Sequence, residues 1–277
     1  MITVNEIGEY DDNDRVLVRA DGFIYLAPSP KLADVVSNYS ITFPTNCIMS
    51  NDYTVVPHGC ATLVYAEENE IVRGDLFGSM LKRTTVGEKA NKCQMIFIIE
   101  LQPVGLAMLT GLEQKPLVGK IVPFEPVNVQ LHASIIKTVE QSTTIKELID
   151  TVEDALFLSQ CSACPPSLKL ATGAIIEHMG NISNAELTKI AASSERQLSR
   201  IFNQYLGMSI KAFSRLVRVN KAIKLLYDPI NNITDVCYLS GFYDLAHFIH
   251  DFKSVCGVTP QEYRNKMADF YNEVAKY

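Results

Sequence analysis

The chain has 277 residues, which is longer than a typical single domain and favours two domains. Hydrophobic residues make up 47% and charged residues 20% of the sequence, a balance typical of globular proteins and unlike that of long disordered regions. The longest apolar run, residues 95–101, is interrupted by Glu100 and is far shorter than the ~20 residues that a membrane span needs, so a transmembrane protein is excluded.

The net charge of −6 is unevenly distributed along the chain. The part before Pro165 carries 12 Lys and Arg against 21 Asp and Glu, a net −9, whereas the rest carries 13 against 10, a net +3. Only the C-terminal part is therefore suited to an anionic partner.

The expected location is the cytoplasm. The acidic N-terminus has neither the basic nor the apolar region of a secretory signal. The seven cysteines show no disulfide framework and are expected to be reduced thiols. Cys161 and Cys164 form a CxxC pair without a second pair at zinc spacing, so neither a metal site nor a cofactor is predicted.

Residues 1 to about 125 are expected to be rich in β-strands, because short apolar or alternating runs are separated by Gly, Pro and Asn. These short strands predict a small β-barrel or β-sandwich. Apolar residues then recur at helical spacing from Leu131 to Leu156, and these helices either close the first domain or pair with a second subunit.

The predicted fold class is α+β, with a β-rich N-terminal domain with helices followed by an all-α domain. Pro165 and Pro166 interrupt the helical pattern. We expect a first, β-rich domain at 1–160, a linker at 161–166 and a second, helical domain at 167–277.

The C-terminal part contains an internal repeat at an offset of 50 residues, which aligns Ser194 with Asp244 and Gly207 with Gly257. Asn184 and Ser194 lie at expected helix N-caps, and the two glycines lie where helices are expected to end. In each copy, two apolar residues four apart predict a helix with one buried face.

A short helix precedes each of these helices, at 185–192 and 233–240, so that each copy is predicted to be a helix-turn-helix unit. A long helix over 210–227 would set the separation of the two units. The outer face of the first repeated helix carries Arg196, Gln197, Ser199 and Arg200, and Arg and Gln suit the edges of guanine and adenine.

The sequence from 185 to 264 resembles the DNA-binding domain of the AraC/XylS family of transcription regulators. The most specific match lies in the second unit and comprises Gly241, Phe242, Asp244, Phe248, Phe252, Lys253, Gly257, Thr259, Pro260, Tyr263 and Arg264.

The resemblance implies that each unit presents one helix to the major groove of double-stranded promoter DNA. Base-facing residues would be Arg196, Gln197, Ser199 and Arg200 in the first unit, and Leu245, Ala246, His247 and His250 in the second. Phosphate contacts would come from Lys253, Arg264 and Lys266. Leu245 and Ala246 cannot hydrogen-bond a base edge, although either could touch a thymine methyl group. Arg218 on the linker helix could contact phosphate or pair with a carboxylate.

The runs VVPHGCATLVYAEEN and GLAMLTGLEQKPLVGKIVPFEPVN resemble an N-terminal β-rich domain of undefined function attached to some of these regulators. That resemblance implies a sensory or dimerising role, with an unidentified small-molecule effector, a second copy of the chain and RNA polymerase as candidate partners. His58 and Cys60 lack a third orienting group, and no phosphate loop, HExxH or GxSxG motif is present, so no catalytic residue is predicted.

The sequence therefore indicates a cytoplasmic, non-enzymatic, sequence-specific transcriptional regulator, with activator among the roles of the family. Two alternatives remain open: a nonspecific or architectural DNA binder, and a ligand-binding or protein-interaction module that has lost sequence reading.

Overall fold

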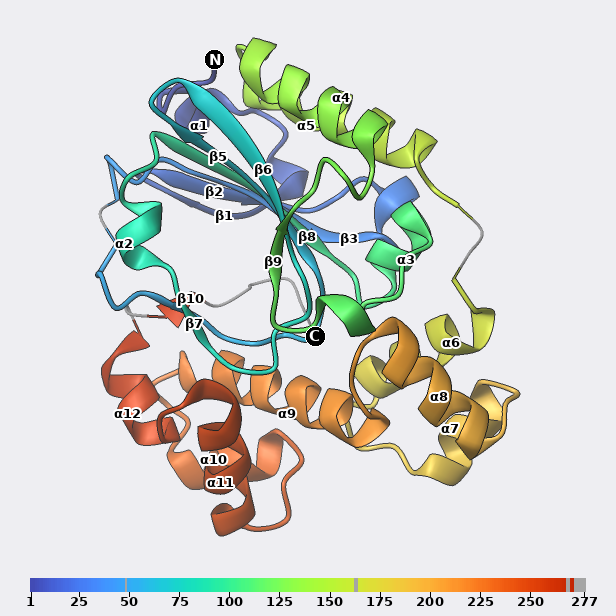
Figure 1. Ribbon diagram of the computed structural model, residues 1–277. Coiled ribbons are helices and arrows are strands. Elements are labelled where there is room, and N and C mark those ends of the chain that lie inside the picture. Colours follow the sequence, from blue (N-terminus) through green and yellow to red (C-terminus); the bar gives the residue numbers. More distant parts are fainter. Residues whose placement is uncertain (48, 162–163, 268–269, 272–277) are drawn as a thin grey trace.

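A computed structural model describes residues 1–47, 49–161, 164–267 and 270–271. A β-rich part lies above a row of helices that runs from α6 to α12 (Figure 1). Ser162 and Ala163, in the middle of the expected linker, lie outside the described residues.

The N-terminal part is built on a seven-stranded sheet whose neighbouring strands are all antiparallel. In spatial order the strands are β1 (Val16–Ala20), β2 (Phe23–Leu26), β3 (Val36–Thr42), β8 (Met95–Leu101), β5 (Thr62–Glu68), β6 (Ile71–Phe77) and β9 (Ile121–Pro123). Shorter elements between them are α1 (Glu6–Glu9), α2 (Gly87–Ala90), α3 (Gly105–Thr110) and the 3-10 turn η3 (Lys115–Leu117). A small second sheet contains β4 (Thr54–Val55), β7 (Thr84–Thr85) and β10 (Phe270–Tyr271).

The large sheet is open. Within the described residues, β1 pairs only with β2 and β9 only with β6, so of the barrel and the sandwich that the sequence predicted, a closed barrel is not formed. The sheet need not close on itself to bury its apolar face, because the helices α4 (Val129–Gln141) and α5 (Ile145–Leu158) cover that face (Figure 1).

The apolar stripe of α4 and α5 is buried within this domain. Asn128 and Thr144 cap the two helices by accepting hydrogen bonds from backbone N–H groups. The core against the sheet contains Leu131, Ile135, Val139, Ile145, Leu148, Ile149, Val152 and Leu156. In the described residues, the stripe therefore packs against the sheet of its own domain.

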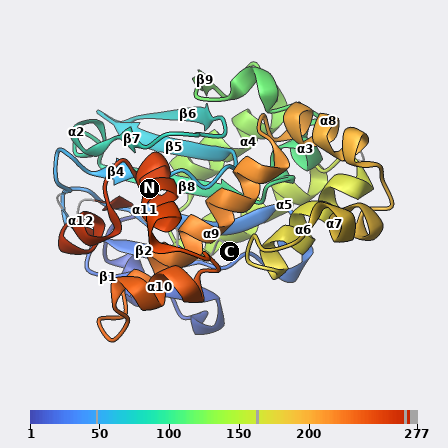
Figure 2. The ribbon, with the colours of Figure 1, turned by 90° about the horizontal axis from the view of Figure 1, so that it is seen from below.

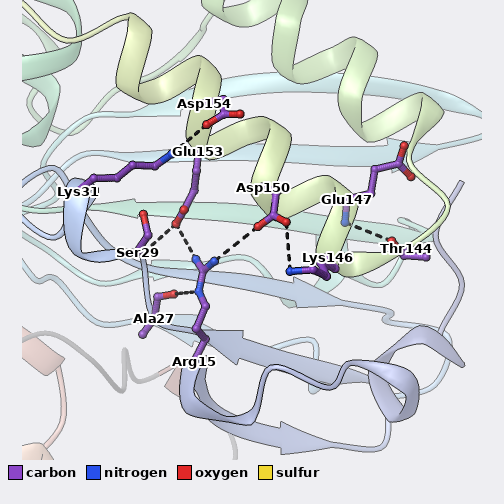
Figure 3. Close-up of polar contacts among 10 residues, drawn as sticks. All are labelled: Arg15, Ala27, Ser29, Lys31, Thr144, Lys146, Glu147, Asp150, Glu153 and Asp154. Carbon is purple, nitrogen blue, oxygen red and sulfur yellow. Dashed lines mark hydrogen bonds and ion pairs between the residues drawn. The ribbon is translucent and has the colours of Figure 1, made fainter.

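A buried carboxylate joins α5 to the edge of the sheet (Figure 3). Glu153 is 3% exposed and accepts hydrogen bonds from Arg15 at 2.6 Å and from the backbone N–H of Ser29 at 2.8 Å. Arg15 also donates to the carbonyl of Ala27. These bonds compensate the desolvation of the carboxylate and hold α5 in register with the first two strands.

From α6 to α12 the C-terminal part consists of helices, as expected, with its own core, whereas β10 departs from the expected all-α domain because it pairs with β4. These helices are α6 (Pro166–Glu177), α7 (Asn184–Ile190), α8 (Glu195–Tyr205), α9 (Ile210–Leu226), α10 (Ile233–Leu239), α11 (Leu245–Cys256) and α12 (Pro260–Asn265). The predicted starts and ends agree to within two residues. Asn184 is the first residue of α7 and not its cap, because Ser183 fills that position.

The two parts of the chain contact each other along α9 and at the ends of α8 and α11. Val56 and Val104 of the N-terminal part belong to the core of the helical part. Asn220 of α9 donates a hydrogen bond to the carbonyl of Pro57 at 3.1 Å, and the buried Ser79 donates to the carbonyl of Leu206 at 3.0 Å. The N-terminal part therefore supports the helices that are expected to meet DNA.

Candidate nucleic-acid interface

The first helix-turn-helix unit comprises α7 and α8. Ser183 and Glu186 form a reciprocal capping box at the start of α7, and hydrogen bonding with Ser183 lowers the pKa of the Glu186 carboxyl. Ala192 turns the chain with a φ of 46°, and Ser194 then caps α8. The two helices are thus joined by a tight turn, as the motif requires.

The face of α8 away from its core is polar. Leu198 and Phe202 are fully buried and anchor the helix. The four residues expected to face bases are all exposed: Arg196, Gln197, Ser199 and Arg200. These donors could therefore approach a ligand without any rearrangement of the core.

The N-terminal part approaches this face near the end of α8. A shallow hollow is lined by Arg196 and Arg200 of α8 and by Glu113 and Lys115 of the segment around η3. Gln204, one turn beyond Arg200, donates a hydrogen bond to Glu113. A duplex on α8 would therefore also lie close to this segment.

The second unit comprises α10 and α11, and its turn is one residue longer. The N-caps of the first unit, Ser183 and Ser194, are 11 residues apart, whereas Asn232 and Asp244 are 12 apart. Gly241 supplies the left-handed turn with a φ of 85°. The repeat at an offset of 50 therefore holds from α8 and α11 onward, but not for the helices that precede them.

The outer face of α11 differs from that of α8. The expected base-facing residues Leu245, Ala246, His247 and His250 are all exposed, but the histidines are tied to a carboxylate that the sequence reasoning missed. Asp251 is 5% exposed and lies 3.2 Å from His247 Nε2 and 3.5 Å from His250 Nδ1.

Arg215 of α9 approaches the same carboxylate at 3.7 Å, so Asp251 links α11 to the helix between the units. The repeat contains the signal that could have identified it: Asp251 aligns with the buried Ile201 of α8, and a carboxylate at a buried position requires partners.

The helix α9 separates the two units (Figures 1 and 2). Its Arg218 donates to the carbonyl of Gly180 at 2.7 Å and lies over the ring of Phe242 at 5.2 Å, and burial lowers the pKa of its guanidinium. Arg218 therefore connects the segment before α7 to the turn of the second unit through a carbonyl and an aromatic ring.

The three expected phosphate contacts have different surroundings. Lys253 of α11 and Lys266 at the end of α12 are exposed. Arg264 donates to the carbonyl of Asn231 at 2.7 Å and so braces the loop before α10. Its planar guanidinium retains further N–H groups, and its contact with phosphate stays a prediction.

His58 and Cys60 of the N-terminal part are buried, whereas Cys161 is exposed. His58 lies 3.5 Å from Glu100 Oε2, which also accepts a hydrogen bond from Thr62 at 2.8 Å. Burial raises the pKa of the Cys164 thiol. Within the described residues, no three His, Cys, Asp or Glu side chains are grouped to hold a metal ion, and no helix is long and apolar enough to cross a membrane.

Comparison with known proteins places the similarity in the helical part. A family described as "Helix-turn-helix domain" matches residues 187–266. The transcriptional regulator ArgR of Pseudomonas aeruginosa is 32% identical over 85 residues, which are 31% of this chain and 26% of ArgR. The transcriptional activator RhaR of Yersinia pseudotuberculosis is 36% identical over 72 residues, 26% of this chain and 25% of RhaR. The chain thus matches about a quarter of the length of these relatives.

Solved structures match either about a third or most of this chain. A probable AraC family regulator from Rhodopseudomonas palustris covers 36% of this chain and 95% of its own, with 26% identity and a TM-score of 0.34. ToxT from Vibrio cholerae covers 88% of this chain and 96% of its own, with 12% identity and a TM-score of 0.44.

The sequence resemblance over 185–264 and the match to the helix-turn-helix family both include the two units and the helix α9 between them. Residues 187–266 of this chain therefore form a helix-turn-helix domain that is similar in sequence to part of the regulators ArgR and RhaR.

Proposed function

We propose that the protein is a sequence-specific DNA-binding regulator of transcription. The observation that carries the proposal is the polar face of α8. Its four side chains are all exposed to solvent: Arg196, Gln197, Ser199 and Arg200. A helix of this kind fits the major groove, and α11 offers a second helix on the same rigid linker.

The N-terminal part supports a regulatory role in this proposal. We place the domain boundary within residues 161–166, and this is supported by the end of α5 at Leu158, the start of α6 at Pro166 and the separate main cores of the two parts. Contacts from the N-terminal part reach α8 and α9, so a change in that part would alter how the helices meet DNA. Within the same proposal, RNA polymerase, a second copy of the chain and a small-molecule effector are the candidates that would cause such a change.

Selection from random duplexes with the full chain tests sequence specificity. A defined binding site should be enriched, and Arg196→Ala and Arg200→Ala should each weaken binding to it by about 1–3 kcal/mol while changing binding to random DNA little. Arg73→Ala removes an exposed arginine of β6 and serves as a matched control that should leave both affinities unchanged. Equal losses on selected and random DNA would reassign the α8 arginines to phosphate contact.

A second candidate is nonspecific or architectural DNA binding. It is favoured by α11, where the first two helical residues, Leu245 and Ala246, cannot form hydrogen bonds with base edges. Under this alternative, excess random DNA removes all binding and the selection yields no common sequence.

A further inference from the structure

The second unit has an exposed apolar surface around its turn. We call Tyr238, Leu239, Tyr243 and Leu245 the apolar turn surface. Tyr243 is 92% exposed and Leu245 37% exposed, although the anchors of the same helix, Phe248 and Phe252, are fully buried. A cluster of exposed apolar side chains on a folded domain marks a place of contact with another molecule.

The internal repeat shows how this surface differs from the equivalent place in the first unit. Leu245 aligns with Glu195 and Ala246 with Arg196, and both pairs occupy the first two positions of their helices. In a helix-turn-helix unit, the N-terminal residues of the second helix contact base edges. The first unit thus presents charged groups at positions where the second presents only hydrocarbon.

The polar side chains that follow on α11 are partly engaged within the protein. One ring nitrogen of His247 and one of His250 lie within 3.5 Å of Asp251. The His247 ring also packs edge-on against Phe242, with 5.8 Å between ring centroids. These contacts orient the two rings toward Asp251. The first two residues of the helix, Leu245 and Ala246, have no polar side chain that could contact a base.

The C5 methyl group of thymine is the apolar group that the base pairs present in the major groove. We propose that the second unit reads thymine through this methyl group, with Leu245 and Ala246 as its contacts, whereas α8 reads bases by hydrogen bonds. This assignment rests on the proposed function. DNA is the expected occupant of this surface, because Leu245 and Ala246 align with Glu195 and Arg196 at the start of α8, the helix that we propose to enter the major groove.

Replacement of thymine by deoxyuridine tests the assignment, because it removes the methyl group and leaves the base pairing intact. The full chain is first used to select a binding site from random duplexes. Each thymine of that site is then replaced singly, and affinities are measured at fixed salt for the wild type, for Leu245→Ala and for two controls. Leu239→Ala removes an exposed leucine of α10, and Arg200→Ala removes an α8 donor.

At one or more positions, the wild type should lose about three- to fivefold in affinity, as expected for one buried methyl group. Leu245→Ala should bind the unmodified site more weakly by a similar factor and should no longer respond to the replacement, while both controls should still respond. Far-UV circular dichroism confirms that each variant is folded.

Three results would overturn the assignment. The first is a selected site at which no replacement changes affinity, and this outcome leaves the proposed function intact. The second is an unchanged response in Leu245→Ala, which means that other residues contact the methyl groups. The third is a Leu245→Ala variant that binds DNA like the wild type but loses activity in a transcription assay, which assigns the apolar turn surface to a protein partner. If selection yields no common sequence, the proposed function fails and the assignment fails with it.

Discussion

Gly207 follows the end of α8, where the first unit meets the N-terminal part. Its φ is 70°, and a Cβ at this position would lie 2.1 Å from Val118 Cγ2. Gly207→Ala therefore adds two costs. The left-handed conformation costs about 1 kcal/mol for a residue with a Cβ, and the overlap with Val118 costs about 1–3 kcal/mol for the displacement that it forces.

A double-mutant cycle separates the two costs. In Val118→Ala, the overlapping methyl group is gone, and the remaining Val118 Cβ would lie at an ordinary 3.6 Å. Gly207→Ala should then destabilise the wild type by about 2–4 kcal/mol but the Val118→Ala background by only about 1 kcal/mol.

Chemical denaturation of the full chain, followed by far-UV circular dichroism, measures both values. Equal effects of Gly207→Ala in the two backgrounds would refute the reasoning, because they would mean that Val118 does not contact the end of α8 in solution. DNA affinity measured in the same variants would report whether that contact positions α8.

Further expectations concern the two cores and the boundary between them. Glu153→Ala should destabilise the chain by about 3–5 kcal/mol, because the mostly buried Arg15 would lose its carboxylate. Glu147→Ala on the same helix should cost about 1 kcal/mol, and a comparable loss in both variants on chemical denaturation would contradict this account. Asn220→Ala should cost about 1–3 kcal/mol on denaturation by leaving a buried carbonyl of the N-terminal part unpaired, and an unchanged midpoint would argue against this domain contact. The fragment 167–277 should fold alone with a strongly helical circular dichroism spectrum, and a disordered fragment would place the domain boundary elsewhere.

The sequence by itself determined the helical part in detail. Cap residues such as Ser194 and Asp244 and stop signals such as Gly257 act within a few residues of the backbone groups that they satisfy. Apolar spacing is equally local, so the helices, their buried faces and the two units could be predicted without knowledge of their neighbours. The exposure of Arg196 and Arg200 followed from the same periodicity.

Only the tertiary structure decided how distant segments meet. The β3–β8 and β8–β5 pairs join strands far apart in sequence, and strand patterns alone do not distinguish an open sheet under two helices from a barrel. Likewise, Arg218 meets Gly180 and Phe242 in the segments before α7 and α11, and Asp251 meets Arg215 of α9. The contact of the N-terminal part with α8 depends on packing between domains, a long-range property for which local caps and periodicity carry no signal.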